Sequence, residues 1–461
     1  MDASGLAAAC WSALHGDVAA LSGLEVTDGD AWLGGPLAVD DLAIGAVSAA
    51  LLGGAELAEA RGAGRPEVRL SAEHVALSFV SERHALRGAH AASGGFAPLS
   101  RFLRCAGDGW ARTHGNYPHH AAAIGRALGI GVGGDPEDAV AALESAAGTL
   151  AAAVLEQRVV DAGGCAAALR TPAEWVAHPA GSAVARAPLV WWEDELAAES
   201  SEPLSPGSSR TSPASGVRVL DLTRVIAGPV AGRTLAALGA EVLRVDPPRL
   251  PELPAQHLDT GAGKRSAVLD LAEAARREQL LAGADVLLAG YRSDSLERFG
   301  ISSEQLASRH PQLVQVWLSA WGRPGPWATR RGFDSLVQVA SGVAAVTASD
   351  DGIPGVLPAQ ALDHATGHLM AAAALRGLSA RARGEAIRPA RLSLARTAKE
   401  LLDAPRPARA TTEATGTADP DRHRVTFEQV SLIAPPGKLD GVALGWAHGP
   451  HPLGADAAAW S

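Results

Sequence analysis

An aspartate at the start of an Ala-rich stretch is the residue of this sequence best placed for covalent chemistry. Asp363 stands in AQALDHATGHLMAAAALRGL (359–378), where a long apolar run predicts a helix, and His364, Thr366 and Gly367 follow closely. A carboxylate at a helix start often serves only as a cap, because the free N–H groups there need an oxygen acceptor. The segment alone therefore leaves open whether Asp363 is only a cap or has a chemical role.

Three histidines form a second group of candidate residues. His114, His119 and His120 lie close together in GGFAPLSRFLRCAGDGWARTHGNYPHH, and clustered imidazoles can bind a metal ion. No acidic or cysteine ligand shares a helical spacing with them, so we expect exposed loop residues and no metal site. The pair Trp191 and Trp192 is more typical of a domain edge than of a ligand site.

Composition and charge restrict the class of protein. The 461-residue chain is long enough for two or three domains with their own cores. Hydrophobic residues make up 47% and charged residues 20%, as in ordinary globular proteins. A formal net charge of -10 gives no basic field for a phosphate backbone, so nucleic acid is not expected as a partner.

The cysteines and the first residues indicate the compartment. Cys10, Cys105 and Cys165 are far apart, form no CxxC pair and are typical of reduced thiols. The start, MDASGLAAACWSALHGD, lacks the basic region of a signal peptide, and no uninterrupted apolar run has membrane-spanning length. We therefore expect a cytoplasmic protein that does not enter a membrane.

The sequence matches itself when it is shifted by 322 positions. PLAVDDLAIGAVSAA then lies over PAQALDHATGHLMAA without a gap, with Asp41 over Asp363. The same register ends with RLS at 69–71 over RLS at 391–393. Matching alanines mean little, whereas Pro, Asp, Gly and RLS matches in one register predict a divergent duplication.

Changes in pattern along the chain predict four parts. The first carries one copy of the repeated segment, the second is a small α+β domain, and the third is a Ser-, Pro- and Glu-rich linker. The fourth is an α/β domain with the other copy and a C-terminal tail. Their boundaries are 1–95, 96–190, 191–215 and 216–461. Within the small domain, we expect a hairpin turn at Gly107–Gly109 and helices that start after Asp135 and Thr171.

The fourth part alternates between apolar strands and helices. The expected strands are 216–222, 241–246, 267–271, 284–290 and 313–320. This order predicts an open, parallel, Rossmann-like sheet, whose ligands bind beyond the carboxyl ends of the strands. The turn Thr223–Pro229 is the natural phosphate or adenine site, but it contains neither GxGxxG nor GK[ST], so an NAD oxidoreductase is disfavoured.

Residues 216–395 carry a series of motifs in a specific order. They are GVRVLDLTRVIAGPVAGRTLAALGAEVLRVD, GKRSAVLDL, ADVLLAGYRSDSLERFGI, HPQLVQVWLSAWGRPGPWATRRGFDSLVQVASG and LDHATG. The series resembles the class III CoA-transferases, the group of formyl-CoA transferase and carnitine CoA-transferase. GFAPLSRFLRCAGDGW and TPAEW resemble that family's smaller domain more faintly. In the family this domain follows the α/β unit, so the chain is similar to a fused or permuted pair of family members.

The resemblance implies a transferase that moves coenzyme A between an acyl-CoA and a carboxylic acid. The family's nucleophilic aspartate falls on Asp363, which would attack the thioester and form a mixed anhydride. We expect the helix N-terminus to keep this carboxylate ionised. The implied partners are an acyl-CoA and a small carboxylic acid, with the CoA thioester as substrate and no further cofactor.

The resemblance also implies which residues contact CoA. They are Val225, Ile226, Ala227, Lys264, Arg265, Gly290, Tyr291, Arg292 and Arg298. Lys264, Arg292 and Arg298 are suitable phosphate ligands on charge grounds, although surface cations of this kind are usually only solvated. The family's cation after the second strand is replaced by Pro247, and Arg249 is the candidate substitute.

Two other functions remain open. The superfamily includes α-methylacyl-CoA racemases, which need a histidine in the GxD step; here that step holds Phe333, although His364 stands beside Asp363. A pseudoenzyme that binds acyl-CoA without turnover is the other alternative. At the first copy, Asp41 is preserved but Ile44 replaces the equivalent of Thr366. We expect this copy to act as a structural partner in a pseudo-dimer within one chain, with a homodimer as the alternative.

Overall fold

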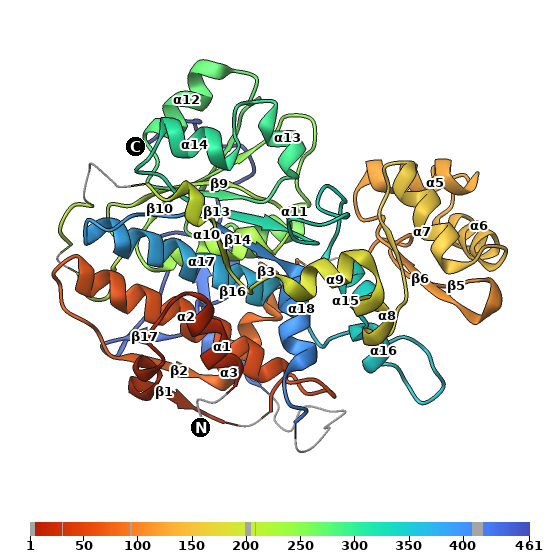
Figure 1. Ribbon diagram of the computed structural model, residues 1–461, viewed down its shortest axis with the longest axis horizontal. Helices are drawn as coiled ribbons and strands as arrows, with labels where there is room; N and C mark the ends of the chain where they lie inside the picture. Colours follow the sequence, from red (N-terminus) through yellow and green to blue (C-terminus); the bar gives the residue numbers. More distant parts are fainter. Residues whose placement is uncertain (1–4, 30, 93–94, 199–203, 208, 408–417) are drawn as a thin grey trace.

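The computed structural model describes residues 5–29, 31–92, 95–198, 204–207, 209–407 and 418–461, shown in Figure 1. It is a mixed α/β structure with several sheets. The predicted linker, 191–215, lies partly outside the described residues. Its first two residues form a strand, and Ser205 and Pro213 accept hydrogen bonds from the Arg61 side chain at 3.0 and 2.7 Å.

A seven-stranded sheet forms the centre of the α/β part. Its strands are β8 (Trp191–Trp192), β9 (Arg218–Leu222), β10 (Glu241–Asp246), β11 (Lys264–Val268), β12 (Val286–Ala289), β13 (Val314–Ser319) and β14 (Ala390–Ser393). The order is β11-β10-β9-β12-β13-β14-β8, and every pair is parallel except β14 with β8. The five strands predicted between 216 and 320 are confirmed, although β11 begins earlier than expected.

The two faces of this sheet are covered by different helices. One apolar cluster joins the sheet to α12 (Ala274–Ala282), α13 (Ser293–Glu297) and α14 (Ser303–Arg309), which lie above the strands in Figure 1. The opposite face packs on α10 (Ala227–Ala237) and α17 (Ala361–Ala382). Strands buried on both faces read as continuous apolar runs, and VLLA in β12 is fully buried.

The strand order places a crevice beside β9. The chain passes from β9 outward to β10 and β11, then returns to the other side of β9 to form β12, β13 and β14. At such a reversal, the loops that leave neighbouring strands diverge and open a crevice at the carboxyl ends. The further helices near this edge are α11 (Pro254–Thr260), α15 (Asp334–Ser341), α16 (Val343–Val346) and α18 (Leu394–Asp403).

Helix α2 (Val39–Ala60) packs along α17, and the two lie side by side in Figure 1. Both contain 22 residues, and their first residues are 322 positions apart. The strand after α2, β2 (Val68–Ser71), is offset from β14 by the same number. Ser71 and Ser393 then cap the following helices in the same way, each accepting a hydrogen bond from the N–H three residues later.

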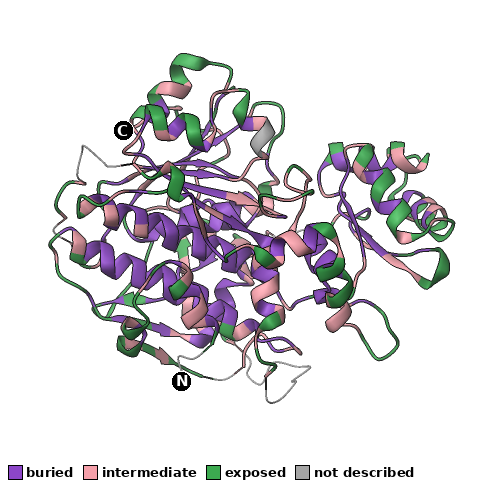
Figure 2. Ribbon diagram, viewed as in Figure 1, coloured by how far each residue is buried: buried purple, intermediate pink, exposed green. Residues whose placement is uncertain are grey.

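Burial explains the apolar sequence of α2. Among the described residues, α2 is the one helix long and apolar enough to cross a membrane, and 94% of its most apolar stretch is buried inside the protein. Figure 2 shows α2 and α17 buried along most of their length.

The small domain contains a three-stranded antiparallel sheet of β5 (Phe102–Arg104), β6 (Trp110–Thr113) and β7 (Ala166–Ala168). Its helices are α5 (Pro118–Leu128), α6 (Pro136–Gly148), α7 (Ala152–Asp161), α8 (Pro172–Ala177) and α9 (Pro179–Arg186). The predicted hairpin is confirmed, since β5 pairs with β6 across the Gly107–Gly109 turn. The predicted caps are confirmed too, because Asp135 and Thr171 each accept a hydrogen bond from the first turn of the helix that follows.

Residues 5–92 do not form a unit of their own, because two sheets join them to the last part of the chain. One has the order β1-β2-β17-β18 and the other β15-β16-β3-β4. The elements are α1 (Leu6–Ala13), β1 (Leu24–Thr27), α3 (Ala72–Ser78), α4 (Ser81–His84), β3 (Leu86–Arg87), β4 (His90–Ala91), β15 (Arg424–Phe427), β16 (Val430–Ile433), β17 (Lys438–Leu439) and β18 (Val442–Ala443). Short 3₁₀ helices lie at Val18–Gly23, Ala106–Asp108, Asp194–Leu196 and Pro420–His423.

Candidate functional site

Two cavities meet at Asp363. The first, about 470 Å³, lies at the carboxyl ends of β9, β12, β13 and β14 and is closed by the small domain, including Tyr117 and His120. The second, about 580 Å³, lies between α4, α11, α17 and the small domain. Val225, Phe333 and Asp363 line both cavities. The predicted crevice beside β9 is therefore the place where the two cavities join.

Asp363 stands in the first turn of α17 and is 5% exposed. Among the described residues, no side chain donates a hydrogen bond to its carboxylate. Burial and the nearby charge of Asp334 raise the pKa of Asp363 well above its ordinary value. The expectation that the helix N-terminus keeps this carboxylate ionised is therefore wrong.

Asp334 explains why the N-terminus of α17 does not lower the pKa of Asp363. Its Oδ2 accepts a hydrogen bond from the backbone N–H of Asp363 at 3.0 Å, so a carboxylate from α15 takes up the free donor of α17. Gln338 donates to the other oxygen of Asp334 and accepts from the N–H of Leu357 at 2.9 Å. Complete burial nevertheless raises the pKa of Asp334 to about 6. Two buried carboxyl groups thus compete for ionisation at one helix end.

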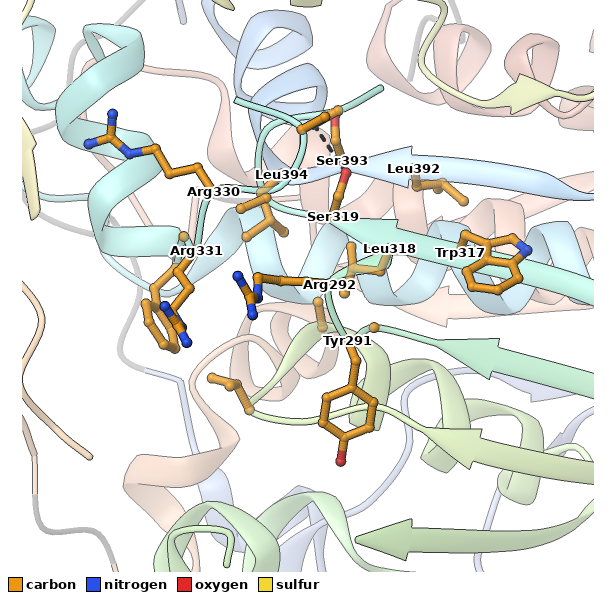
Figure 3. Close-up of a pocket in the computed structure, with 18 of the residues that line it drawn as sticks. Tyr291, Arg292, Trp317, Leu318, Ser319, Arg330, Arg331, Leu392, Ser393 and Leu394 are labelled. Carbon is orange, nitrogen blue, oxygen red and sulfur yellow. Dashed lines mark hydrogen bonds between the residues drawn. The ribbon is translucent and has the colours of Figure 1, made fainter. Parts of the chain in front are cut away.

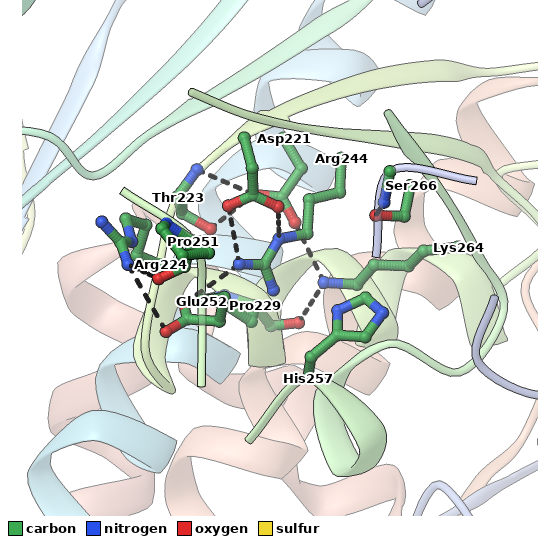
Figure 4. A network of polar contacts seen from close by, with 12 residues as sticks. Asp221, Thr223, Arg224, Pro229, Arg244, Pro251, Glu252, His257, Lys264 and Ser266 are labelled. Carbon is green, nitrogen blue, oxygen red and sulfur yellow. Dashed lines mark hydrogen bonds and ion pairs between the residues drawn. The ribbon is translucent and has the colours of Figure 1, made fainter. Parts of the chain in front are cut away.

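The turn after β9 forms a strained wall between the cavities. Val225 has a φ of 71°, a left-handed conformation that is costly for a β-branched residue. Its N–H donates to Oε2 of Glu252 at 2.8 Å, and Glu252 also binds Arg244 at 3.0 Å. The hydroxyl of Tyr117 donates to Glu252, which ties the small domain to this wall. Figure 4 shows Glu252 beneath Arg224 and Arg244.

Glu252 is ionised in spite of its burial. Burial opposes the charged form, but Arg244 and Arg224, with the hydrogen bonds from Tyr117 and Val225, lower the pKa of Glu252 to about 2. This carboxylate can therefore hold the strained turn in place at neutral pH.

Arginines dominate the first cavity. Its described lining contains six of them and a single carboxylate, that of Asp363. The six are Arg224, Arg292, Arg323, Arg330, Arg331 and Arg391. Four pair with glutamates, whereas Arg331 donates to the carbonyl of Gly163 at 3.2 Å. Figure 3 shows Arg292 extending toward Arg331. Such a lining favours a polyanionic ligand.

The sequence did not single out five of these arginines for ligand binding: Arg224 follows β9, three lie in the loop 320–332, and Arg391 is in β14. Their position beyond strand ends is the signal that could have found them.

The sequence predicted that His114, His119 and His120 would be exposed loop residues, and this prediction is wrong for two of them. His114 and His120 are each 4% exposed, and His119 and His120 begin helix α5. The ring of His114 stacks on Phe333 with centroids 3.6 Å apart and planes 5° apart. Burial lowers the pKa of both buried imidazoles to about 3. No group of three metal-ligating side chains occurs among the residues that the structure describes.

Most of the predicted CoA contacts come together at the cavities. Val225, Ala227, Gly290, Tyr291 and Arg292 line the first cavity, and Ile226 lines the second.

Four other basic residues named in the sequence lie elsewhere. Lys264 is 1% exposed and pairs with Asp221 at 2.9 Å, while Arg265 binds Glu241 at 3.2 Å. Arg298 packs over the Phe299 ring at 4.5 Å, and Arg249 is exposed; neither lines a cavity. Charge alone could not reveal that Lys264 and Arg265 are engaged in structural ion pairs.

Asp363 and Asp41, the residue aligned with it in the match at offset 322, have different surroundings. His364 is fully buried, stacks on Phe79 with centroids 5.2 Å apart, and lies 3.8 Å from Glu82. Asp41 is exposed and lies outside both cavities.

Part of this chain is similar in sequence to known CoA-transferases. Residues 214–429 match the family model of CoA-transferase family III. A probable fatty acyl-CoA transferase of Mycobacterium tuberculosis is 35% identical over 194 residues, 39% of this chain and 49% of that protein. A succinate–glutarate CoA-transferase of Agrobacterium fabrum is 34% identical over 167 residues, 32% of this chain and 42% of that protein. The chain thus spans about half or less of these curated relatives.

Among solved structures, a hypothetical protein from M. tuberculosis is similar at 35% identity, with a TM-score of 0.38, over 41% of this chain and 57% of that one. A CAIB/BAIF family protein from Brucella suis has 25% identity and the same TM-score, over 49% of this chain and 66% of that one. The matched segment of this chain contains the parallel sheet, the arginines of the first cavity and Asp363. On the sequence match, residues 214–429 belong to CoA-transferase family III.

Proposed function

We propose that the protein transfers coenzyme A between an acyl-CoA and a carboxylic acid, with Asp363 as the nucleophile. The observation that carries the proposal is the position of Asp363. It lies within the family-matched segment, where an arginine-lined cavity meets a second cavity whose described lining contains one arginine. The two sides of a thioester need two such environments, because CoA is polyanionic and the acyl group is not.

The chemistry balances with the acyl-CoA and the acceptor acid alone. A carboxylate oxygen of Asp363 attacks the thioester carbon, the C–S bond breaks, and CoA leaves as its thiolate. The thiolate then attacks the aspartyl carbonyl carbon and expels the donor acid. The acceptor carboxylate repeats these two steps in reverse and leaves as its CoA thioester, while Asp363 returns as a carboxylate. Each exchange thus passes through two easier steps.

Asp363 must lose its proton before it can attack, because burial and Asp334 raise its pKa. CoA carries no positive charge that could stabilise the Asp363 carboxylate. The arginines of the first cavity are therefore the groups that favour its ionised form. Arg292, itself a predicted CoA contact, and Arg331 are two candidates, and both line this cavity (Figure 3).

The fold-level part of the proposal is that residues 1–95 and the segment around α17 arose as copies. The offset of 322 positions relates α2 to α17 and β2 to β14, and both strands end in a capping serine. In this proposal the first copy is a structural half of a pseudo-dimer with a Rossmann-like partner. Its exposed Asp41 lines neither of the two cavities described above, so one active site is expected. The protein is expected to be cytoplasmic.

A racemase or isomerase is the second candidate function. Phe333 occupies the place of the racemase histidine, yet His114 stacks on this ring and His364 adjoins Asp363. Both histidines line the second cavity and carry ring nitrogens that have no hydrogen-bond partner among the described residues. Two imidazoles beside a carboxyl group are suited to move a proton at the α-carbon of an acyl-CoA.

Hydroxylamine trapping tests the proposal. The protein is incubated with a panel of acyl-CoAs and hydroxylamine, digested and examined by mass spectrometry. A hydroxamate at Asp363 with release of free CoA is the expected result. A hydroxamate at Asp41 would instead assign the chemistry to the first copy.

Solvent exchange separates the two candidate functions. Incorporation of deuterium at the α-carbon without CoA release or aspartyl modification would replace the transferase by a racemase. Tight CoA binding with neither reaction would leave a non-catalytic acyl-CoA-binding protein.

A further inference from the structure

The walls of the second cavity come from three distant parts of the chain. Glu82 and Arg83 belong to α4, Phe96 and His114 to the small domain, and Asp363 to α17. If the thioester carbon lies at Asp363 and CoA occupies the arginine-lined cavity, the acyl group must extend into this second space. Its volume of about 580 Å³ lies within the ordinary range for a small-molecule site.

Apolar side chains make up a large part of the wall. They include Phe96, Val225, Ile226, Leu253 and Phe333. A hydrocarbon stem would be stabilised here by the removal of its surface from water. An acyl group of hydrocarbon alone, however, would leave the polar part of the wall without partners.

Buried polar atoms without a hydrogen-bond partner gather around this cavity. Among the described residues, they are Oγ of Ser335, Oδ1 of Asp259, Nδ1 of His114, Oε1 of Gln256 and Nδ1 of His364; Nε2 of His364 faces Oε2 of Glu82 at 3.8 Å. Four of these side chains are at least nine-tenths buried: Ser335, Asp259, His114 and His364. A buried polar atom without a partner is destabilising, so such a concentration in one cavity wall indicates a hydrogen-bonding ligand.

The charges around the cavity argue against a second carboxylate on the ligand. Glu82, Asp259, Asp334 and Asp363 supply four carboxyl groups to the lining, against Arg83 as its one arginine among the described residues. Arg83 has a 55% exposed side chain and already donates to the carbonyl of Pro358 at 2.6 Å. Asp259 is met by Arg233 at 3.0 Å, which lies outside the lining. A carboxylate here would therefore lie among carboxyl groups, and the one arginine of the described lining is already engaged.

We infer that the second cavity selects acyl groups that carry uncharged hydrogen-bonding substituents, such as hydroxyl or oxo groups, on a hydrocarbon stem. Plain alkyl acyl groups leave the polar wall unpartnered, and dicarboxylic acyl groups place a second negative charge among carboxyl groups. This inference rests on the proposed function only for the position of the thioester at Asp363.

Binding to a variant that cannot turn over tests the inference apart from catalysis. Titration calorimetry of Asp363→Asn is run with three kinds of six-carbon thioester: hexanoyl-CoA, adipoyl-CoA, and a group comprising 3-hydroxy-, 5-hydroxy- and 3-oxohexanoyl-CoA. At least one substituted thioester should bind about tenfold more tightly than hexanoyl-CoA, and adipoyl-CoA should bind most weakly. Equal affinities, or a preference for hexanoyl- or adipoyl-CoA, would overturn the inference.

Two further variants locate the source of the preference. Gln256→Met and Ser335→Ala, each added to Asp363→Asn, remove a polar group while keeping the shape of the wall nearly unchanged. Either should reduce the preference for the substituted thioester about threefold or more, with the affinity for hexanoyl-CoA retained. Gln305→Met, on the exposed surface of α14, is the matched control and should leave the preference intact.

The outcomes distinguish this inference from the proposed function. A preference for the substituted thioesters without any hydroxamate at Asp363 in the unmodified protein would retain the cavity assignment and reject the transfer chemistry. A hydroxamate formed equally from all the thioesters, with equal affinities, would retain the transfer chemistry and reject the cavity assignment.

Discussion

Gly53 and Leu375 face each other where α2 and α17 cross. A Cβ added at Gly53 would lie 3.2 Å from the Cβ of Leu375, and the two residues are 322 positions apart. The same offset relates Asp41 to Asp363. A contact between residues at matching positions of two similar segments is also found where an isologous dimer interface crosses its two-fold axis.

Substitution at this crossing should weaken the pairing of the two helices. Gly53→Val adds a branched side chain against Leu375 and is expected to lower the free energy of unfolding by about 1–3 kcal/mol through overpacking. Thermal unfolding followed by circular dichroism measures the loss. Adding Leu375→Ala should return part of the stability. Gly23→Val, where nothing lies within 4 Å of the added Cβ, is the control, and an equal loss there would remove the special role of the crossing.

The acidity of Asp363 predicts how stability changes with pH. Its pKa is raised in the folded protein, so the folded state binds the proton more tightly than the unfolded chain does. Below the ordinary aspartate pKa, Asp363 is protonated in both the folded and the unfolded state, so its ionisation does not lower the stability of the fold. As the pH rises from there through the folded-state pKa, the protein loses stability. Asp363→Asn removes the ionisation. The variant should melt at a higher temperature than the unmodified protein at pH 8, with a smaller difference at pH 4.

Each tenfold change in the acid dissociation constant is worth about 1.4 kcal/mol, so the difference in melting temperature should be readily measured. Asp41→Asn is the matched comparison, because the exposed Asp41 has its pKa raised by partial burial only. Its stabilising effect at pH 8 should be the smaller of the two. A melting difference for Asp363→Asn that does not grow with pH would contradict the buried, protonated carboxyl group.

Arg331 and Arg298 should differ sharply in their effect on acyl-CoA. Arg331 lines the first cavity, where charge-assisted hydrogen bonds to a phosphate are worth about 1.5–3 kcal/mol. Arg331→Gln is therefore expected to raise the Kd for CoA roughly 10- to 100-fold and to weaken its dependence on salt. Arg298→Gln should leave both unchanged, since Arg298 lies outside the cavities. Calorimetry at two salt concentrations measures both, and the reverse order of effects would restore the sequence-based assignment of Arg298.

Lys264 should affect stability rather than CoA binding. It pairs with the fully buried Asp221 at 2.9 Å and donates to the carbonyl of Pro229 at 2.7 Å, as Figure 4 shows. Lys264→Met leaves the Asp221 carboxylate buried and unpaired, which is expected to cost about 3–5 kcal/mol. Adding Asp221→Asn should recover part of the loss in chemical denaturation. If the folded variant binds CoA much more weakly while its stability is unchanged, Lys264 is a phosphate ligand after all.

Local patterns predicted much of the fold. Apolar runs and caps identified β9 to β13 and the helices that follow Asp135 and Thr171, because these signals act within a few residues. The one-register match at offset 322 aligned the two segments that form α2 and α17, which are equal in length. The position of Asp363 at a helix start was predictable in the same way.

Features set by contacts between distant residues were not predictable. The pKa of Asp363 depends on Asp334, which is 29 residues earlier and takes the helix donor that the sequence assigned to Asp363. The burial of His114 depends on its contact with Phe333, from another domain. Neither relation leaves a periodic or compositional signal, so the second cavity and its polar wall could be seen only in three dimensions.

The separation of α2 from α17 along the chain also sets a schedule for synthesis. At about 5–20 residues per second, the ribosome completes the 22-residue apolar helix α2 roughly 15 to 60 s before its partner α17 emerges. During that interval, the apolar surface of α2, which is buried in the folded protein, is exposed to water and to other chains. The nascent chain should therefore engage holding chaperones early, and its yield should depend on them more than that of a protein whose helices pair with near neighbours.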